Sequence, residues 1–226
     1  MKNFITHITD LFYPRICQVC GKKLYLQEEI LCTECIYDMP RINSYLTSEN
    51  QVKNIFTGRF PVENAAALLF FKKGSAYRKL IHKLKYKKKP EIGIYLGHLL
   101  AEDININNIN YIVPVPLHHR KKKIRGYNQS EMFAQGISEI LNIPIDTQTL
   151  IRSSFTHTQT QKTRYERWEN VKSVFTITDK KKFQDKHILL VDDIITTGAT
   201  LEGCSLALLK IKSIKISIAA IGIASN

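Results

Sequence analysis

Two adjacent carboxylates followed by a threonine-rich loop are the residues of this chain with the clearest chemical potential. Residues 188–200 read I-L-L-V-D-D-I-I-T-T-G-A-T. When ionised, Asp192 and Asp193 can only accept hydrogen bonds, so they suit sugar hydroxyls or a hydrated metal ion. The loop after them offers backbone N–H groups, threonine hydroxyls and one glycine, which suits a phosphate. A ribose 5-phosphate unit would satisfy both halves of the pattern.

A buried strand and a helix must position these residues. The apolar run at 188–191 is typical of a parallel strand covered on both faces, and ligands of open α/β sheets bind outside the carboxyl ends of such strands. We therefore expect Asp192 and Asp193 to hold ribose hydroxyls, with Mg²⁺. We expect the 5-phosphate to bind residues at the start of the next helix, namely Thr196, Thr197, Gly198, Ala199 and Thr200.

Other readings of the same pattern stay open. A buried strand followed by an Asp-capped turn has a similar sequence pattern, and paired aspartates also occur in metal and phosphoacceptor sites. A G-x-x-x-x-G-K-[ST] loop is absent, which argues against a P-loop nucleotidase.

Four of the five cysteines form two C-x-x-C pairs, Cys17 with Cys20 and Cys32 with Cys35. Two such pairs can bring four thiolates to one point, which predicts a closed structural zinc site. An iron–sulfur centre and unmetallated thiols are the alternatives. Four thiolates leave no open coordination position, so we expect this metal to stabilise a small fold rather than to catalyse.

A basic segment and a polar segment contain the candidate ligands of a pyrophosphate. Arg125 beside Gly126 offers a bidentate donor and close backbone approach, whereas Lys121–Lys123 read as mostly solvated. Residues 152–170 are rich in threonine and include Arg164 and Arg167, which fits a cationic lid over the site. A variable surface loop is nearly as good a reading of that segment.

The periodicity along the chain predicts alternating strands and helices. Strands are expected at 65–71, 111–115, 188–191 and 214–223, and helices at 77–84, 92–100, 128–141 and 201–212. This alternation predicts an α/β fold with a doubly wound parallel sheet. We expect the cysteine-bearing unit with an N-terminal helix at 1–45, a linker at 46–60 and the main domain at 61–226.

Composition sets broad limits on the class of protein. The chain has 226 residues, 44% of them hydrophobic, and a net charge of +13. This content supports a sizeable core, and the charge favours polyanionic partners or is simply a lysine-rich surface. No stretch is long enough for a transmembrane helix, and residues 1–14 read as an amphipathic helix rather than a signal peptide. We therefore expect a cytoplasmic protein with reduced thiols.

The motifs together resemble a known family. Residues 188–200 are similar to the phosphoribosyl pyrophosphate (PRPP) signature of type I phosphoribosyltransferases. With the four cysteines, P-V-P-L-H at 114–118, R-G-Y-N-Q at 125–129, Gln161 and R-W-E-N-V at 167–171, the chain resembles the ComF family of amidophosphoribosyltransferase-like proteins. That resemblance implies PRPP binding and a role in natural competence and single-stranded DNA uptake, with a helicase-like partner.

Three functions remain compatible with the sequence. The chain is a PRPP-binding accessory protein, an active phosphoribosyltransferase on an unidentified nitrogenous acceptor, or a zinc-finger adaptor for nucleic acid. Only 26 residues follow Thr200, so residues 60–105 are the better source of a cover over an acceptor. Neither the acceptor nor the oligomeric state follows from the sequence.

Overall fold

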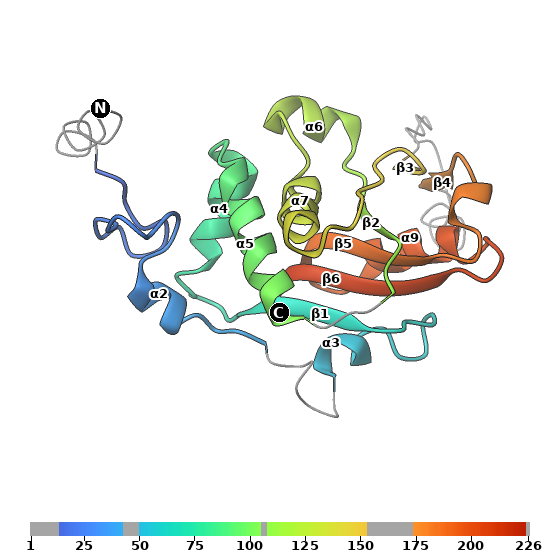
Figure 1. The fold of residues 1–226 in the computed structure, drawn as a ribbon, viewed down its shortest axis with the longest axis horizontal. Coiled ribbons are helices and arrows are strands. Elements are labelled where there is room, and N and C mark those ends of the chain that lie inside the picture. Colours follow the sequence, from blue (N-terminus) through green and yellow to red (C-terminus); the bar gives the residue numbers. More distant parts are fainter. Residues whose placement is uncertain (1–13, 43–49, 105–107, 153–173, 225–226) are drawn as a thin grey trace, which may run out of the picture.

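A parallel sheet organises the computed structural model, which describes residues 14–42, 50–104, 108–152 and 174–224. Its four strands have the order β1-β6-β5-β2, and all three neighbouring pairs are parallel. The strands are β1 (Ala65–Phe71), β2 (Tyr111–Pro114), β5 (His187–Ile195) and β6 (Lys215–Ala224). Figure 1 shows how the helices surround this sheet.

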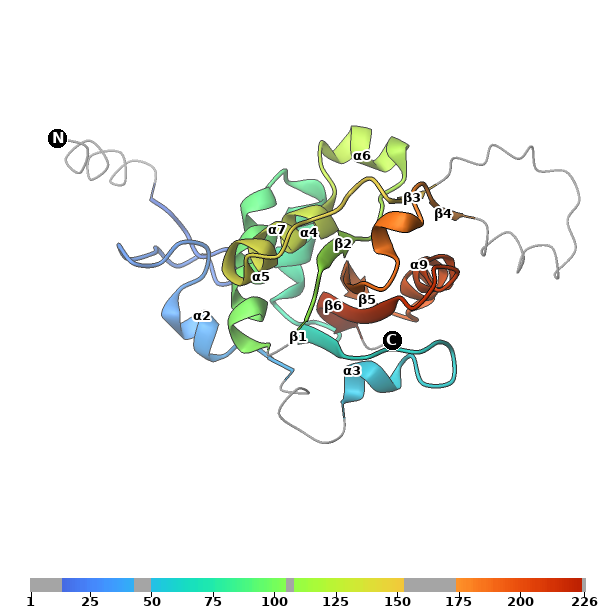
Figure 2. The same ribbon diagram turned by 45° about the vertical axis from the view of Figure 1, so that its right-hand side comes forward.

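Helices cover both faces of the sheet, as Figure 2 shows. One face carries α4 (Arg78–Tyr86), α5 (Pro90–Asp103) and α7 (Gln129–Leu141), and the other carries α3 (Gln51–Asn54) and α9 (Ala199–Leu208). Side chains alternate along β1 because the strand has a period of two. Ala66 and Leu68 join the core under α4, α5 and α7, while Ala65 and Ala67 join the core under α3 and α9. The predicted doubly wound α/β fold is therefore confirmed.

The predicted elements lie close to their expected positions, with two differences. Pro90 occupies the first turn of α5, where its missing N–H costs nothing, so it begins a helix as well as ending the preceding pattern. Strand β5 continues through the acid pair, because Asp192 lies opposite Ala220 and Ile195 opposite Ile223 in the ladder with β6. The acid pair therefore sits on rigid sheet backbone rather than in the loop.

Three smaller elements complete the main domain. The basic segment forms a short exposed helix, α6 (His119–Arg125), which the sequence periodicity did not predict. An antiparallel pair, β3 (Leu150–Arg152) and β4 (Phe175–Ile177), flanks residues 153–173, and the 3₁₀ helix η1 (Lys181–Phe183) follows it.

Residues 50–60 correct the prediction of a linker at 46–60. Val52 and Phe56 are fully buried and Phe60 is 8% exposed, all in the core beneath α3 and α9. These residues lie four apart, so a helical turn places them on one apolar face. Asn50 begins the turn by accepting a hydrogen bond from the N–H of Lys53. Residues 46–49 lie outside the described ranges.

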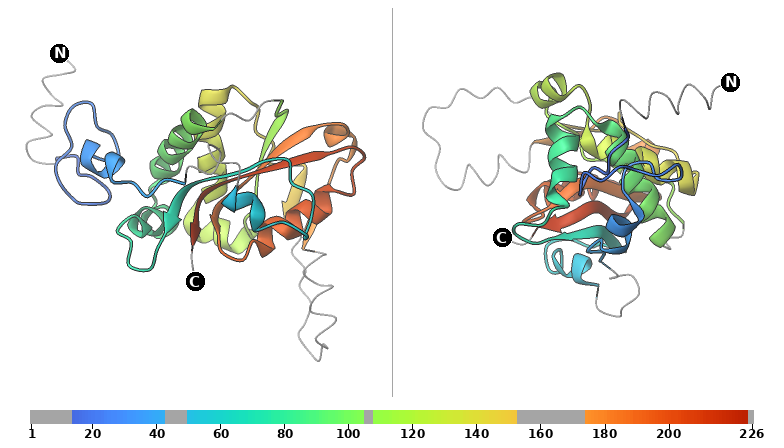
Figure 3. Two further views of the ribbon diagram at one scale, coloured as in Figure 1. Left: turned by 90° about the horizontal axis from the view of Figure 1, so that it is seen from below. Right: turned by 90° about the vertical axis from the view of Figure 1, so that its left-hand side faces the viewer.

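The cysteine-bearing unit lies at one end of the molecule, beside α4, and contains the short helix α2 (Thr33–Tyr37) (Figure 3). The Tyr77 hydroxyl donates to the carbonyl of Cys35 at 2.7 Å, and Lys83 Nζ donates to the carbonyl of Gln18 at 2.9 Å. The unit therefore packs on the main domain. The helix expected at residues 1–14 lies almost entirely outside the described residues. Within the described part, none of the helices combines the length and hydrophobicity of a membrane span.

Candidate phosphoribosyl site

The acid pair is held by side chains from two helices on the same face of the sheet. Asp192 Oδ1 accepts hydrogen bonds from Ser130 Oγ at 3.2 Å and from the N–H of Asp193 at 2.8 Å. Asp193 Oδ2 forms an ion pair with Lys85 Nζ at 2.7 Å. Ser130 lies in the first turn of α7, and Lys85 lies in the last turn of α4. The sequence analysis did not identify either residue as part of the site.

The electrostatic environment of the site raises the pKa of Asp192. Enclosure by protein, followed by the nearby charge of Asp193, raises the pKa of Asp192 to about 7, although Ser130 and Lys85 act in the opposite direction. Two carboxylates side by side cannot both ionise freely, since like charge disfavours the charged form. Asp192 is therefore partly protonated at neutral pH, and a cation or a set of hydroxyl donors at the pair would favour its ionised form.

The expected phosphate loop joins β5 to α9. Gly198 has φ = 75° and is the N-cap of α9, a left-handed conformation that favours glycine. It is buried, and a Cβ there would lie 2.8 Å from a ring carbon of Phe56. The remaining loop residues are exposed: Thr196, Thr197, Ala199 and Thr200. The loop thus presents exposed hydroxyls and the N-terminus of a ten-residue helix a few residues after the acid pair.

Arg59 holds this loop from the far side, and the sequence analysis missed it. Its Nη1 donates to the carbonyl of Thr197 at 2.6 Å, and its Nε donates to Glu202, in the first turn of α9, at 3.1 Å. A second donor, Nη2, pairs with the same Glu202 oxygen. The spacing of Val52, Phe56 and Phe60 was the available signal, because it predicts a helical turn that directs the intervening Arg59 toward the core edge.

Arg125 contacts residues of α4 and α7 that adjoin, in sequence, the partners of the acid pair. Its guanidinium stacks 5.5 Å from the Tyr86 ring, next to Lys85, and it donates to Gln129, next to Ser130. Arg125 and the acid pair thus both contact α4 and α7, at adjacent positions of each helix. Gly126 has φ = 86° and its N–H caps α6 at the carbonyl of Lys122, so its backbone donor is already used.

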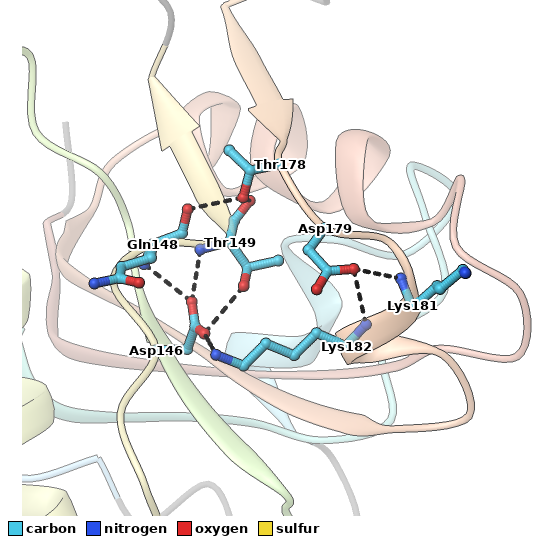
Figure 4. A network of polar contacts seen from close by, with 7 residues as sticks. All are labelled: Asp146, Gln148, Thr149, Thr178, Asp179, Lys181 and Lys182. Atoms are coloured by element: carbon cyan, nitrogen blue, oxygen red, sulfur yellow. Dashed lines mark hydrogen bonds and ion pairs between the residues drawn. The ribbon is translucent and has the colours of Figure 1, made fainter.

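The predicted lid residues Arg164 and Arg167 lie outside the described residues. The ends of their segment are anchored by the network in Figure 4. Asp146 accepts from the N–H groups of Gln148 and Thr149 at 3.0 and 2.7 Å, from the Thr149 hydroxyl at 3.0 Å, and from Lys182. Burial raises the pKa of Asp146, but these donors outweigh burial and leave its pKa below the ordinary value.

The four cysteines converge as the sequence predicts. Their sulfur atoms all lie within 4.8 Å of one another, and Sγ of Cys20 and Cys32 are 3.6 Å apart. Sulfurs of a tetrahedral zinc site are about 3.8 Å apart, since each Zn–S bond is about 2.3 Å. Burial opposes ionisation of Cys17, but backbone N–H groups of Cys20, Cys32 and Val19 lower its pKa to about 6. With Cys35, this donor set fits a metal ion.

Comparison with known proteins identifies a matching domain and several similar proteins. Residues 128–224 match the family model of the phosphoribosyl transferase domain. Competence protein F of Haemophilus influenzae is 39% identical over 101 residues, which span 44% of each chain. The DNA utilization protein YhgH of Escherichia coli K12 is 27% identical over 202 residues, which cover 86% of this chain and 84% of YhgH. The chain thus spans less than half the length of Competence protein F.

Solved structures give a more distant likeness. Glutamine PRPP amidotransferase from B. subtilis is 19% identical, with a TM-score of 0.43 over 60% of this chain and 30% of that enzyme. The domain match, the parallel sheet and the named relatives agree with one another. This chain therefore contains a phosphoribosyltransferase domain and is similar to the ComF-type proteins.

Proposed function

We propose that this protein binds PRPP with Mg²⁺ at the carboxyl ends of β5 and β2. The arrangement of β5 and α9 carries the proposal, because it sets two carboxylates a few residues from an exposed helix N-terminus. Asp192 and Asp193 hold the ribose hydroxyls, with the metal ion beside them. Thr196, Thr197, Gly198, Ala199 and Thr200 hold the 5-phosphate.

The pyrophosphate lies on the side of the site that α6 covers. Arg125 neutralises it, with Arg164 and Arg167 from the segment after β3, and Gly126 allows close approach. Lys85 pairs with Asp193, so bound Mg²⁺ would share that carboxylate with Lys85. In an active enzyme, these fixed charges would stabilise the departing pyrophosphate and the cationic sugar. Mg²⁺ would supply further neutralisation of the same leaving group.

A thermal shift experiment tests PRPP binding. PRPP with Mg²⁺ at one hundred times its Kd stabilises a one-site protein by about 2.7 kcal/mol, so the melting temperature rises measurably. The double variant Asp192→Asn with Asp193→Asn should lose this rise. Asp185→Asn makes the same chemical change at an exposed residue before β5 and should retain it. An equal rise in all three proteins would exclude the acid pair from the site.

We propose that the ion in the cysteine unit is structural zinc. Four thiolates favour zinc over harder ions, and their closed geometry leaves no position for a substrate. Purified protein should contain about one zinc per chain by atomic emission. Cys35→Ser should lose that zinc, whereas Cys204→Ala changes a buried cysteine of α9 and should keep it. Folded wild-type protein without metal would contradict the proposal.

We also propose that the protein acts in the handling of single-stranded DNA, because its relatives include proteins named Competence protein F and DNA utilization protein YhgH. The exposed cations of α6 support this role, and they are Arg120, Lys121, Lys122 and Lys123. Such cations bind phosphates in proportion to their number, so affinity should fall steeply with salt. Changing Lys121–Lys123 to Gln should flatten the log–log salt slope by about 2. An unchanged slope would exclude α6 as the contact. The helicase-like partner stays a prediction.

A further inference from the structure

A cavity of roughly 330 Å³ opens beside the acid pair. Its lining includes Phe71 and Ala224, the last residues of β1 and β6, and Ile194, which follows Asp193 in β5. It therefore lies at the carboxyl ends of three adjacent parallel strands, where ligands of such sheets bind. Lys85 lines the cavity and also reaches Asp193, so the cavity and the proposed ribose site share a wall.

The lining combines a flat apolar floor with a cationic rim. Phe71 and Ile81 are buried beneath the cavity, and the ring of Phe71 packs over Gly222, where a Cβ would lie 2.4 Å from it. The rim comes from one exposed edge of α4, which presents Arg78, His82 and Tyr86. The rings of His82 and Tyr86 lie 5.1 Å apart.

Charge is the most selective property of this cavity. Two of its eight lining residues, Arg78 and Lys85, are cations, and none is acidic. Lys85 is paired with Asp193, whereas no carboxylate within the described ranges pairs with Arg78. A guanidinium with free donors matches a carboxylate by two parallel hydrogen bonds. The cavity therefore favours a ligand that is flat and apolar on its faces and anionic at one edge.

We infer that this cavity takes the acceptor of a phosphoribosyl transfer, and that the acceptor is a single-ring aromatic acid with a nucleophilic nitrogen. The volume is near the lower limit of small-molecule sites, about 300 Å³, which suits one ring. Arg78 binds the carboxylate, and the ring lies on Phe71, Ile81 and Ile194. The inference rests on the proposed PRPP site, because that site supplies the sugar.

The transfer balances without any further reactant. The lone pair of the acceptor nitrogen forms the N–C1 bond with the ribose while the bond from C1 to the pyrophosphate oxygen breaks. The electron pair of that bond leaves with the pyrophosphate. An amine acceptor then loses one proton from nitrogen to solvent.

Binding of three small probes tests the chemical class, with calorimetry on the full chain. 2-Aminobenzoate has the ring, the anion and the amine, benzoate lacks the amine, and aniline lacks the anion. We expect 2-aminobenzoate and benzoate to bind at least about tenfold more tightly than aniline, since one charge-assisted hydrogen bond is worth that much. Equal binding of aniline, or no binding of either acid, would overturn the inference.

Matched variants locate the binding. Arg78→Gln should weaken binding of the two acids about tenfold and leave aniline unchanged, whereas Lys210→Gln removes an exposed cation near the end of α9 and should change nothing. Ala224→Phe should fill the floor and weaken all three probes, and Ile194→Phe is the alternative if that variant does not fold. If neither Arg78→Gln nor the floor variants changed the affinity for the two acids, the assignment would be overturned.

The PRPP thermal shift separates this inference from the proposed function. Arg78→Gln should keep the shift, because Arg78 is outside the sugar and phosphate contacts. A wild-type PRPP shift without acid binding would overturn only the acceptor assignment. Acid binding without a PRPP shift would overturn the proposed function and, with it, the acceptor role. A thymidine decanucleotide that binds with the same Arg78 and Ala224 dependence, when the acids do not, would replace the small acid by a nucleic-acid base.

Discussion

Replacing Asp192 by Asn should change how the stability of the protein depends on pH. The folded-state pKa of Asp192 is about 7, against an ordinary value of 3.8. Between these values the folded protein binds the proton more tightly than the unfolded chain does, so the free energy of unfolding falls as pH rises. The loss is absent below 3.8 and complete above about 7. Asn cannot ionise, so the variant should lack this loss.

The size of the effect follows from the same two pKa values. One pH unit is worth about 1.4 kcal/mol, so the loss in the wild type is about 4 kcal/mol at most. This is an upper bound because part of Asp192 reaches the surface, where solvent screens its charge. Asn can still accept the hydrogen bonds from Ser130 and from the N–H of Asp193 through its oxygen.

Urea unfolding of both proteins at pH 4.5, 6 and 8 (values chosen to span about one pKa range) measures the difference directly. We expect the variant to gain stability relative to the wild type as pH rises, while Asp185→Asn tracks the wild type throughout. Parallel stability curves for the Asp192 variant and the wild type would refute the reasoning, since they would show that Asp192 ionises as easily in the folded protein as in the unfolded chain.

Three further perturbations have defined outcomes. Gly136→Ala should destabilise the protein by about 3 kcal/mol in urea unfolding, because its Cβ would lie 2.0 Å from the carbonyl of Ile94 where α5 meets α7; a loss below the error of the fit would contradict this packing. Arg59→Gln should lower the free energy of unfolding by about 1–2 kcal/mol and weaken PRPP binding measured by calorimetry, because Glu202 and the phosphate loop lose a shared donor. Unchanged PRPP affinity would show that the loop keeps its conformation without Arg59. Asp146→Asn should be less stable than the wild type at neutral pH, and the two should converge as pH falls below 3.8, because a lowered carboxyl pKa gives stability that is lost on protonation. A constant difference down to low pH would contradict the ionised state of Asp146.

Local patterns predicted the main elements because their causes are local. The apolar run at 65–71 forms β1 over the same residues, and the helix expected from 128 begins at Gln129 with Asn128 as its N-cap. The Glu131 side chain follows Asn128 at the spacing of a capping box, but it accepts from Lys122 of α6 at 3.1 Å. That partner is nine residues away, and a short-range motif has no information about it.

Local sequence patterns did not predict the contacts between segments that are distant in the sequence. Arg59 lies 138 positions before Thr197, and its segment was expected to be a linker because it is mostly polar. Its role depends on three buried side chains that bring it under the phosphate loop. Lys85 lies in the last turn of α4, and only the packing of α4 on the sheet brings it to Asp193.

The order of residue types along the chain was enough to determine the chemistry that this protein can offer: an acid pair before a glycine and threonine loop, and four cysteines in two close pairs. Those features act over a few residues, where backbone geometry follows from composition. Tertiary structure alone decided which side chains surround the carboxylates and how far the pKa of Asp192 is raised. It also decided that α4 lines a cationic cavity beside them. Burial and proximity arise when helices pack on a sheet, so they depend on the whole fold.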